Sequence, residues 1–312
     1  MDLIAKRNIF FLISAIVLLP GIIFLAINPG LKPGIDFTGG SITTFQTSDN
    51  VNQDDLRGLI TDIKHPEAII QGMGDNTFLV RTKQLSDDQK SQIINTVQER
   101  LSPGGVELLA FDLVSAVVAA QTVVNSFYAV LAAAVGIFLY LWWAFRNVPS
   151  PFRYGVAAII ALVHDSLVVI GIFAILGGLL DIEVNTMFLV AILTVIGYSV
   201  NDTIVVFDRL RENIIGYPNR SLAKNANISI MESLGRSLNT SLTLIFTIIA
   251  LLVVGGETIR IFLYVLLIGV IAGTYSSVGI ATQFLVMWEQ GSFRRLFRRS
   301  RSSETSADTA NA

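Results

Sequence analysis

The chain contains six long apolar stretches that are separated by shorter polar segments. They lie near residues 8–28, 122–145, 154–179, 186–208, 237–255 and 261–288. A helix needs about 20 apolar residues to cross a hydrocarbon core of roughly 30 Å, so the pattern predicts six membrane-spanning helices. The first stretch follows Lys6 and Arg7 and is too long for the apolar region of a signal peptide, so we expect a retained anchor.

The segment between the first two stretches has the shorter periodicities of a soluble α+β domain. Alternating apolar residues predict strands over 41–47, 67–72, 76–82 and 106–113. Helical spacing predicts helices over 51–63 and 86–101, with Asn50 and Ser86 as their N-caps. The order βαββαβ is the ferredoxin-like arrangement. We therefore predict a membrane all-α bundle of six transmembrane helices with an external ferredoxin-like α+β domain.

This pattern divides the chain into four parts. They are transmembrane helix 1 (1–28), the external domain (29–118), a five-helix transmembrane bundle (119–290) and a basic, then disordered cytoplasmic tail (291–312). Lys and Arg collect in the loops on one side, for example Arg146 and Arg153 between the second and third stretches. Positively charged loops stay in the cytoplasm, so we expect both termini there and the ferredoxin-like domain outside.

Composition supports a polytopic membrane protein and excludes several kinds of site. Hydrophobic residues make up 52% of the chain and charged residues 15%, with a mean hydropathy of +0.62. There are no cysteines and two histidines, which argues against disulfides and against metal sites built from Cys or several His. The external domain has no nucleophile–base pair and no phosphate-binding loop. We expect a binding or mechanical protein with no enzyme active site, cofactor or nucleic-acid partner.

One carboxylate, Asp202, interrupts the fourth apolar stretch. An ionisable group at membrane depth costs at least about 2.5 kcal/mol, so such groups usually face a bundle interior and mark an ion or proton path. The alternative is that Asp202 lies near the interface and only caps the helix, although its stem is too short to snorkel far. Ser199, Asn201 and Thr203 surround it in sequence, as expected for a wet interior face.

Arg236 begins the fifth stretch from the same side of the membrane, at a depth that matches Asp202. It is followed at helical spacing by a polar stripe, which would hold water or form interhelical hydrogen bonds: Asn239, Thr240, Thr243 and Thr247. The alternative for Arg236 is a positive anchor that only sets topology.

His164 and Asp165 lie about ten residues into the third stretch, near the middle of the membrane. They are further proton-path candidates, and the alternative is an interhelical hydrogen bond. We rank them below Asp202 because their polar surroundings look thinner. Gly269, Gly273 and Ser277 follow one another at four-residue spacing in the sixth stretch and predict a close-packing face, against either the fourth span or a partner subunit.

A glycine-rich motif, GIDFTGG, stands just after the first stretch and leads into the first predicted strand. It predicts a structural turn in which Asp36 bonds the local backbone. The residues of this motif that we single out are Gly34, Asp36, Phe37, Gly39 and Gly40.

These features together resemble the SecD/SecF family, within the larger resistance–nodulation–division (RND) transporter group. The features are GIDFTGG, the ferredoxin-like domain, the His164–Asp165 pair and SVNDTIVVFDRLREN at the end of the fourth stretch. Phe37 favours the SecF form of the glycine motif. The resemblance implies a subunit in a bacterial or archaeal plasma (inner) membrane that works with a SecD-like subunit and the SecYEG channel. A small accessory membrane subunit and contacting lipid are further candidate partners.

In that family, proton flow would help to draw an unfolded secreted polypeptide outward after SecA has pushed it through the channel. The resemblance ties proton movement to Asp202 and Arg236. Two rival hypotheses remain from the sequence. One is half of an RND-type exporter of small molecules, since six spans with one external insert equal half of that architecture. The other is a non-transporting assembly factor of the channel.

Overall fold

The computed structural model describes residues 2–27, 30–256 and 259–291. It contains six helical segments that are long and apolar enough to cross a membrane, as predicted. They are α1 (Arg7–Ala26), α5 (Ala116–Ala144), α6 (Pro151–Leu180), α7 (Thr186–Gly216), α8 (Leu222–Val254) and a last segment made of α9 (Arg260–Ser276), the π-helical turn η2 (Ser277–Ala281) and α10 (Thr282–Glu289). Except for Gly291, the predicted tail lies outside the described residues.

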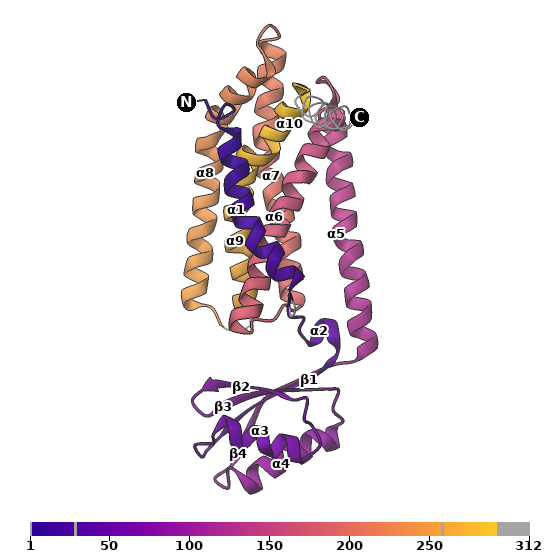
Figure 1. Ribbon diagram of the computed structural model, residues 1–312, viewed down its shortest axis with the longest axis vertical. Coiled ribbons are helices and arrows are strands. Elements are labelled where there is room, and N and C mark those ends of the chain that lie inside the picture. Colours follow the sequence, from indigo (N-terminus) through magenta and orange to yellow (C-terminus); the bar gives the residue numbers. More distant parts are fainter. Residues whose placement is uncertain (1, 28–29, 257–258, 292–312) are drawn as a thin grey trace, which may run out of the picture. The chain divides into compact units, whose positions relative to one another are not determined.

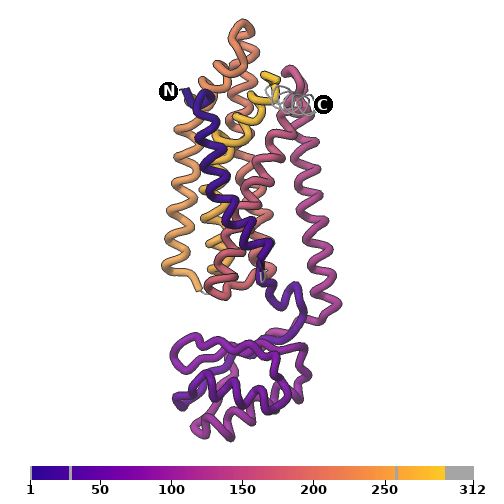
Figure 2. Tube along the Cα trace, viewed as in Figure 1, coloured from indigo at the N-terminus to yellow at the C-terminus, as the bar shows by residue number. Residues whose placement is uncertain are grey.

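The chain forms two compact units. One unit joins the residues up to Lys32 with those from Ala129 onward and contains the packed helices, and the other is Pro33–Tyr128. Figure 2 shows how the chain leaves the helical unit after α1 and returns to it along α5.

The smaller unit has the predicted βαββαβ order. Its four-stranded antiparallel sheet has the strand order β2-β3-β1-β4. Its elements are α2 (Ile35–Thr38), β1 (Gly40–Thr47), α3 (Gln53–Asp62), β2 (Ile69–Gly74), β3 (Thr77–Thr82), α4 (Asp87–Arg100) and β4 (Val106–Val114). Helices α3 and α4 cover one face of the sheet (Figure 1). Between them and the sheet lies a core that includes Phe45, Leu56 and Val97, each fully buried.

The predicted cap of α4 is confirmed, and that of α3 is wrong. Ser86 and Gln89 form a capping box, in which the Ser86 hydroxyl accepts from the Gln89 amide at 3.3 Å and the Gln89 side chain accepts from the Ser86 amide at 2.9 Å. In α3 the cap is Asn52, whose side chain accepts from the Asp54 amide at 2.9 Å. Asn50 lies too far before the first turn to reach those amides.

Helices α7 and α8 continue well beyond the apolar stretches that predicted them. We predicted spans over 186–208 and 237–255, whereas α7 ends at Gly216 and α8 begins at Leu222. The extra turns form a polar helical hairpin, held by the Arg209–Glu232 ion pair at 2.7 Å and by the Asn213 amide on Ser229 at 2.9 Å. Hydropathy marks only the apolar part of such a helix.

The close-packing face of α9 lies against α7, which decides between the two partners that the sequence allowed. A Cβ atom at Gly273 would lie 2.9 Å from the Cβ atom of Ser199, and one at Gly269 would overlap the side chain of Val195. The third residue of this face, Ser277, is fully buried at the start of η2. These glycines therefore bring the backbones of α7 and α9 together.

Candidate functional site

The glycine motif folds as a turn at the start of the smaller unit, directly before β1. Its residues 35–38, which include Asp36 and Phe37, form the single helical turn α2, and the Thr38 hydroxyl donates to the Gly34 carbonyl at 3.0 Å. Gly39 and Gly40 follow with φ values of 74° and 135°, in the region that favours glycine. A Cβ atom at Gly40 would also lie 2.7 Å from the Thr82 carbonyl oxygen. The connection of α2 to β1 thus requires glycine at positions 39 and 40.

Asp202 lies inside the helical unit and is 8% exposed. The hydroxyl of Ser277, from η2, donates to its carboxylate at 2.8 Å. The hydroxyl of Ser237, from α8, lies beside the same carboxylate but outside hydrogen-bonding geometry. Asp202 is therefore an interior group that three helical segments surround, rather than a cap at the end of α7.

Two of its three expected polar neighbours share this interior position. Ser199 and Thr203 are each 1% exposed, whereas Asn201 points to the outside of the unit. Successive residues of a helix are separated by about 100°, so Asn201 cannot share the face on which Ser199, Asp202 and Thr203 lie. The expectation that all three residues form one wet interior cluster is wrong for Asn201.

Arg236 does not contact Asp202 in this structure. Its side chain is exposed on α8, and the buried residue beside Asp202 is its neighbour Ser237. Within the part of the chain that the structure describes, Arg236 forms no ion pair. The polar stripe that continues from it is also exposed: Asn239, Thr240, Thr243 and Thr247.

The threonines of this stripe bond to their own helix. Thr240 donates to the Arg236 carbonyl at 2.9 Å, and Thr243 donates to the Thr240 carbonyl at 2.9 Å. These hydrogen bonds stay within α8, so the stripe remains exposed on the surface of the helical unit, where lipid, water or another chain can contact it.

Asp165 has the richest set of hydrogen bonds among the candidate residues, so the expectation of thinner polar surroundings at this site is wrong. The carboxylate, 1% exposed, accepts from Ser199 of α7 at 2.5 Å and from Ser276 of α9 at 2.6 Å. Its other oxygen lies 2.9 Å from Nδ1 of His164. The surroundings looked thin in the sequence because these donors come from other helices.

The network continues from His164 toward α1. Nε2 of His164 lies 3.0 Å from the hydroxyl of Ser14, which lies 3.2 Å from the hydroxyl of Tyr275. Tyr275 in turn donates to the Phe10 carbonyl at 2.5 Å. The sequence analysis missed Ser14, Tyr275 and Ser276. Their only signal was a polar group within an apolar stretch, which does not show whether the group meets a carboxylate.

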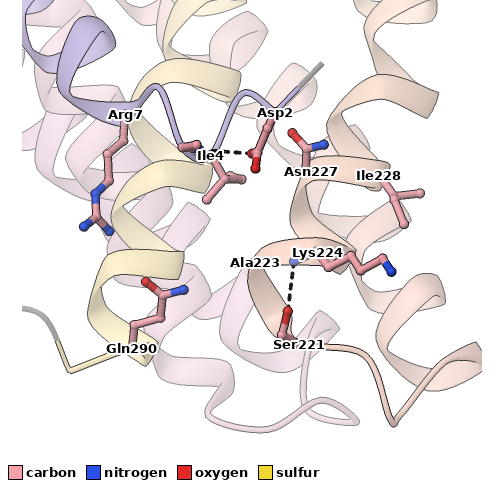
Figure 3. A pocket seen from close by; sticks show the side chains of 10 residues that line it. Asp2, Ile4, Arg7, Ser221, Ala223, Lys224, Asn227, Ile228 and Gln290 are labelled. Atoms are coloured by element: carbon pink, nitrogen blue, oxygen red, sulfur yellow. Dashed lines mark hydrogen bonds between the residues drawn. The ribbon is translucent and has the colours of Figure 1, made fainter.

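A separate hollow of about 760 Å³ lies beside the N-terminal residues (Figure 3). Its wall includes Asp2, Arg7, Lys224 and Gln290. The side chains of Arg7 and Lys224 point to opposite sides of it. The interior carboxylates, which are buried and hydrogen-bonded, remain the candidate functional centre.

Comparison with known families and proteins gives a consistent result. Residues 93–291 match the family described as "Protein export membrane protein SecD/SecF, C-terminal", and residues 24–51 match the SecD/SecF GG motif. The chain is 40% identical to protein translocase subunit SecF of Thermobaculum terrenum, covering 96% of this chain and 97% of that protein. It is also 40% identical to SecF of Anaerolinea thermophila, with the same coverage.

Solved structures of SecDF proteins are similar to this fold. The crystal structure of SecDF from Thermus thermophilus, described as a translocon-associated membrane protein, matches with a TM-score of 0.80 and 30% identity. It covers 93% of this chain, which spans 39% of that longer protein. SecDF in a super-membrane-facing form matches 95% of this chain with a TM-score of 0.58 and 29% identity. The chain therefore belongs to the SecD/SecF family of membrane proteins of the Sec protein-export pathway, as a multi-pass member of the SecF type.

Proposed function

We propose that this chain works with a SecD-like subunit to use the proton motive force in protein export through the SecYEG channel. The observation that carries the proposal is the pair of buried carboxylates, Asp165 and Asp202, at membrane depth. Serine hydroxyls donate to both carboxylates, His164 also lies 2.9 Å from Asp165, and no Lys or Arg of the described residues forms an ion pair with either. A hydroxyl can donate or accept, so this environment admits the ionised and the protonated carboxyl, as a proton carrier requires.

Arg236 supplies the second part of the proposed cycle. It lies next to Ser237, the residue of α8 that faces Asp202. A rotation of α8 would exchange these two neighbours at the carboxylate. Approach of the guanidinium favours release of a proton, and its withdrawal favours reloading. Each proton that crosses 100 mV supplies about 2.3 kcal/mol, which would favour one state of the external domain over another.

The exposed polar stripe on α8, together with Asn201 on α7, supports a SecD-like partner. Among these groups, the side-chain amides of Asn201 and Asn239 would be costly to leave in contact with lipid chains, and a second bundle would cover them. The Thermus thermophilus structure, in which this chain matches 39% of a SecDF protein, supports the same arrangement. Copurification from native membranes tests it. We expect a SecD-like subunit to be found by mass spectrometry, and a monodisperse monomer in mild detergent without one would contradict the proposal.

The proposed site of action is a plasma (inner) membrane with both termini in the cytoplasm. There the external domain would meet the unfolded polypeptide as it leaves the channel. The functional test uses vesicles that contain this chain, the SecD-like subunit and SecYEG, with SecA and an imposed proton gradient. We expect the gradient to accelerate completion of export and Asp202→Asn to remove that acceleration. An undiminished response in the variant would favour an assembly factor that moves no protons.

A further inference from the structure

Helix α9 changes to a π-helical turn at the level of the two carboxylates. The turn, η2, covers Ser277–Ala281, and all five of its residues are buried. The hydroxyl of the fully buried Thr282, the first residue of α10, donates to the Ser277 carbonyl at 2.8 Å. Single π-helical turns are rare and frequently lie at functional sites.

Two consecutive serines at this junction reach carboxylates of two different helices. Ser276 donates to Asp165 of α6 at 2.6 Å, and Ser277 donates to Asp202 of α7 at 2.8 Å. Each hydroxyl also has a second acceptor on its own helix. For Ser276 this is the Gly273 carbonyl at 3.2 Å, and for Ser277 it is the Thr274 carbonyl at 3.0 Å.

A serine hydroxyl has one proton, so it donates fully to only one of these acceptors at a time. An ionised carboxylate is the stronger acceptor, since charge-assisted hydrogen bonds are about twice as strong as neutral ones. A protonated carboxyl has its own O–H donor. The serine then accepts from that group and turns its proton to the backbone carbonyl. The Gly273 carbonyl also accepts the Ser277 amide, so this change occurs at the backbone bond that precedes the π-helical turn.

We propose that Ser276 and Ser277 convert protonation of Asp165 and Asp202 into a change of helical register at the α9–η2 junction. This inference rests on the proposed proton-driven function and names the element that would transmit it. The glycine face of α9 places this junction directly against the helix that carries Asp202, because Gly269 and Gly273 let the backbones of α9 and α7 approach closely. Conversion of the π-helical turn to α-helix shifts α9 by about 1.5 Å, the rise of one residue.

Spin labels test the shift directly, because the chain contains no natural cysteine that would also be labelled. Phe152→Cys and Tyr264→Cys place labels at exposed positions near the starts of α6 and α9. The helices α6 to α9 follow one another through short connections and alternate in direction, so these starts lie at opposite ends of the bundle. The distance is measured in the complex, in lipid, with native carboxylates and with Asp165→Asn/Asp202→Asn, which imitates the neutral form.

We expect the Asn substitutions to move the mean distance by about 1.5 Å on the native background. In a protein that also carries Ser276→Ala/Ser277→Ala, the Asn substitutions should leave the mean distance unchanged. The matched control is Ser233→Ala, because within the described chain this buried hydroxyl donates only to the Ser229 and Ile230 carbonyls of its own helix. An equal shift on all backgrounds, or no shift on any, overturns the inference.

The single variants keep the test decisive if the double serine variant does not fold. Ser277→Ala should cancel the effect of Asp202→Asn alone, and Ser276→Ala that of Asp165→Asn alone. The failure of the inference is distinct from that of the proposed function. If Asp202→Asn stops proton-driven export but leaves the distance unchanged, only the register change is wrong. If Asp202→Asn exports normally under a proton gradient, the proton-driven function is wrong.

Discussion

Asp202→Asn is the sharpest test of the proton-driven function. The amide has nearly the shape of the carboxylate, and it keeps a hydrogen bond to the Ser277 hydroxyl, which lies 2.8 Å from the native carboxylate; like a protonated carboxyl, the amide can donate in that bond. It carries no charge and takes up no proton in the physiological range. The substitution therefore removes proton exchange while it keeps the packing of a residue that is 8% exposed.

The structure sets the expected effect on folding. A charge-assisted bond becomes a neutral one, which costs about 1 kcal/mol. The loss is offset because a neutral amide is cheaper to bury than a carboxylate. We expect the free energy of unfolding to change by no more than about 1 kcal/mol, so the variant should reach the membrane in normal amounts.

The expected effect on transport is much larger. One proton crossing 100 mV supplies about 2.3 kcal/mol. That energy corresponds to a factor of about 50 in a rate or a population, since 1.36 kcal/mol is tenfold. The variant should lose the whole acceleration that the gradient gives to export in vesicles, and it should keep the rate that SecA drives alone.

Asp208→Asn is the matched control, because Asp208 lies on the same helix with 45% of its side chain exposed and pairs with Arg211 at 2.6 Å. It should respond to the gradient like the native protein, since exposed pairs contribute little. If Asp202→Asn also responds like the native protein, Asp202 carries no proton that export needs. If both variants fail equally, the loss reflects charge on α7 in general and the reasoning about the buried site is refuted.

Three further predictions use the same materials. Arg236→Lys should give a partial loss of gradient-driven export, because Lys keeps the charge without the planar guanidinium, and a fully active Arg236→Ala would reduce this residue to a topology signal. A disulfide engineered between the external domain and loop 181–185 should stop the gradient-driven stage until it is reduced, while the SecA-driven stage continues; export at the full rate while cross-linked would make the domain a static platform. Gly269→Ala should lower the free energy of unfolding of the purified protein by about 1–3 kcal/mol, because the added Cβ atom overlaps Val195. Gly197→Ala, whose Cβ atom would have no atom within 4 Å, should leave the stability unchanged. Equal thermal unfolding of the two variants would contradict the packing argument.

The sequence alone was sufficient for the class of fold. Hydropathy depends on local composition, so each of the six spans, α7 among them, could be predicted from its own apolar stretch. Alternation with period two and helical spacing predicted the βαββαβ order, and Ser86 identified its helix start because a capping box is a local pattern. The same local signals were less exact at boundaries, where the cap proved to be Asn52 and the start of α8 proved to be Leu222.

The candidate site was only partly predictable, because its contacts join residues far apart in the chain. Asp202 could be singled out, since a carboxylate within an apolar stretch is conspicuous in any sequence. Ser276 and Ser277 contact two carboxylates because of the way α9 packs against α6 and α7. The sequence does not show which residue of another helix a serine in an apolar helix will contact. Likewise, matching depth made Arg236 a plausible partner for Asp202, but depth does not fix rotation about a helix axis. Only the packing of α8 decided that Ser237 faces the carboxylate and that Arg236 faces outward.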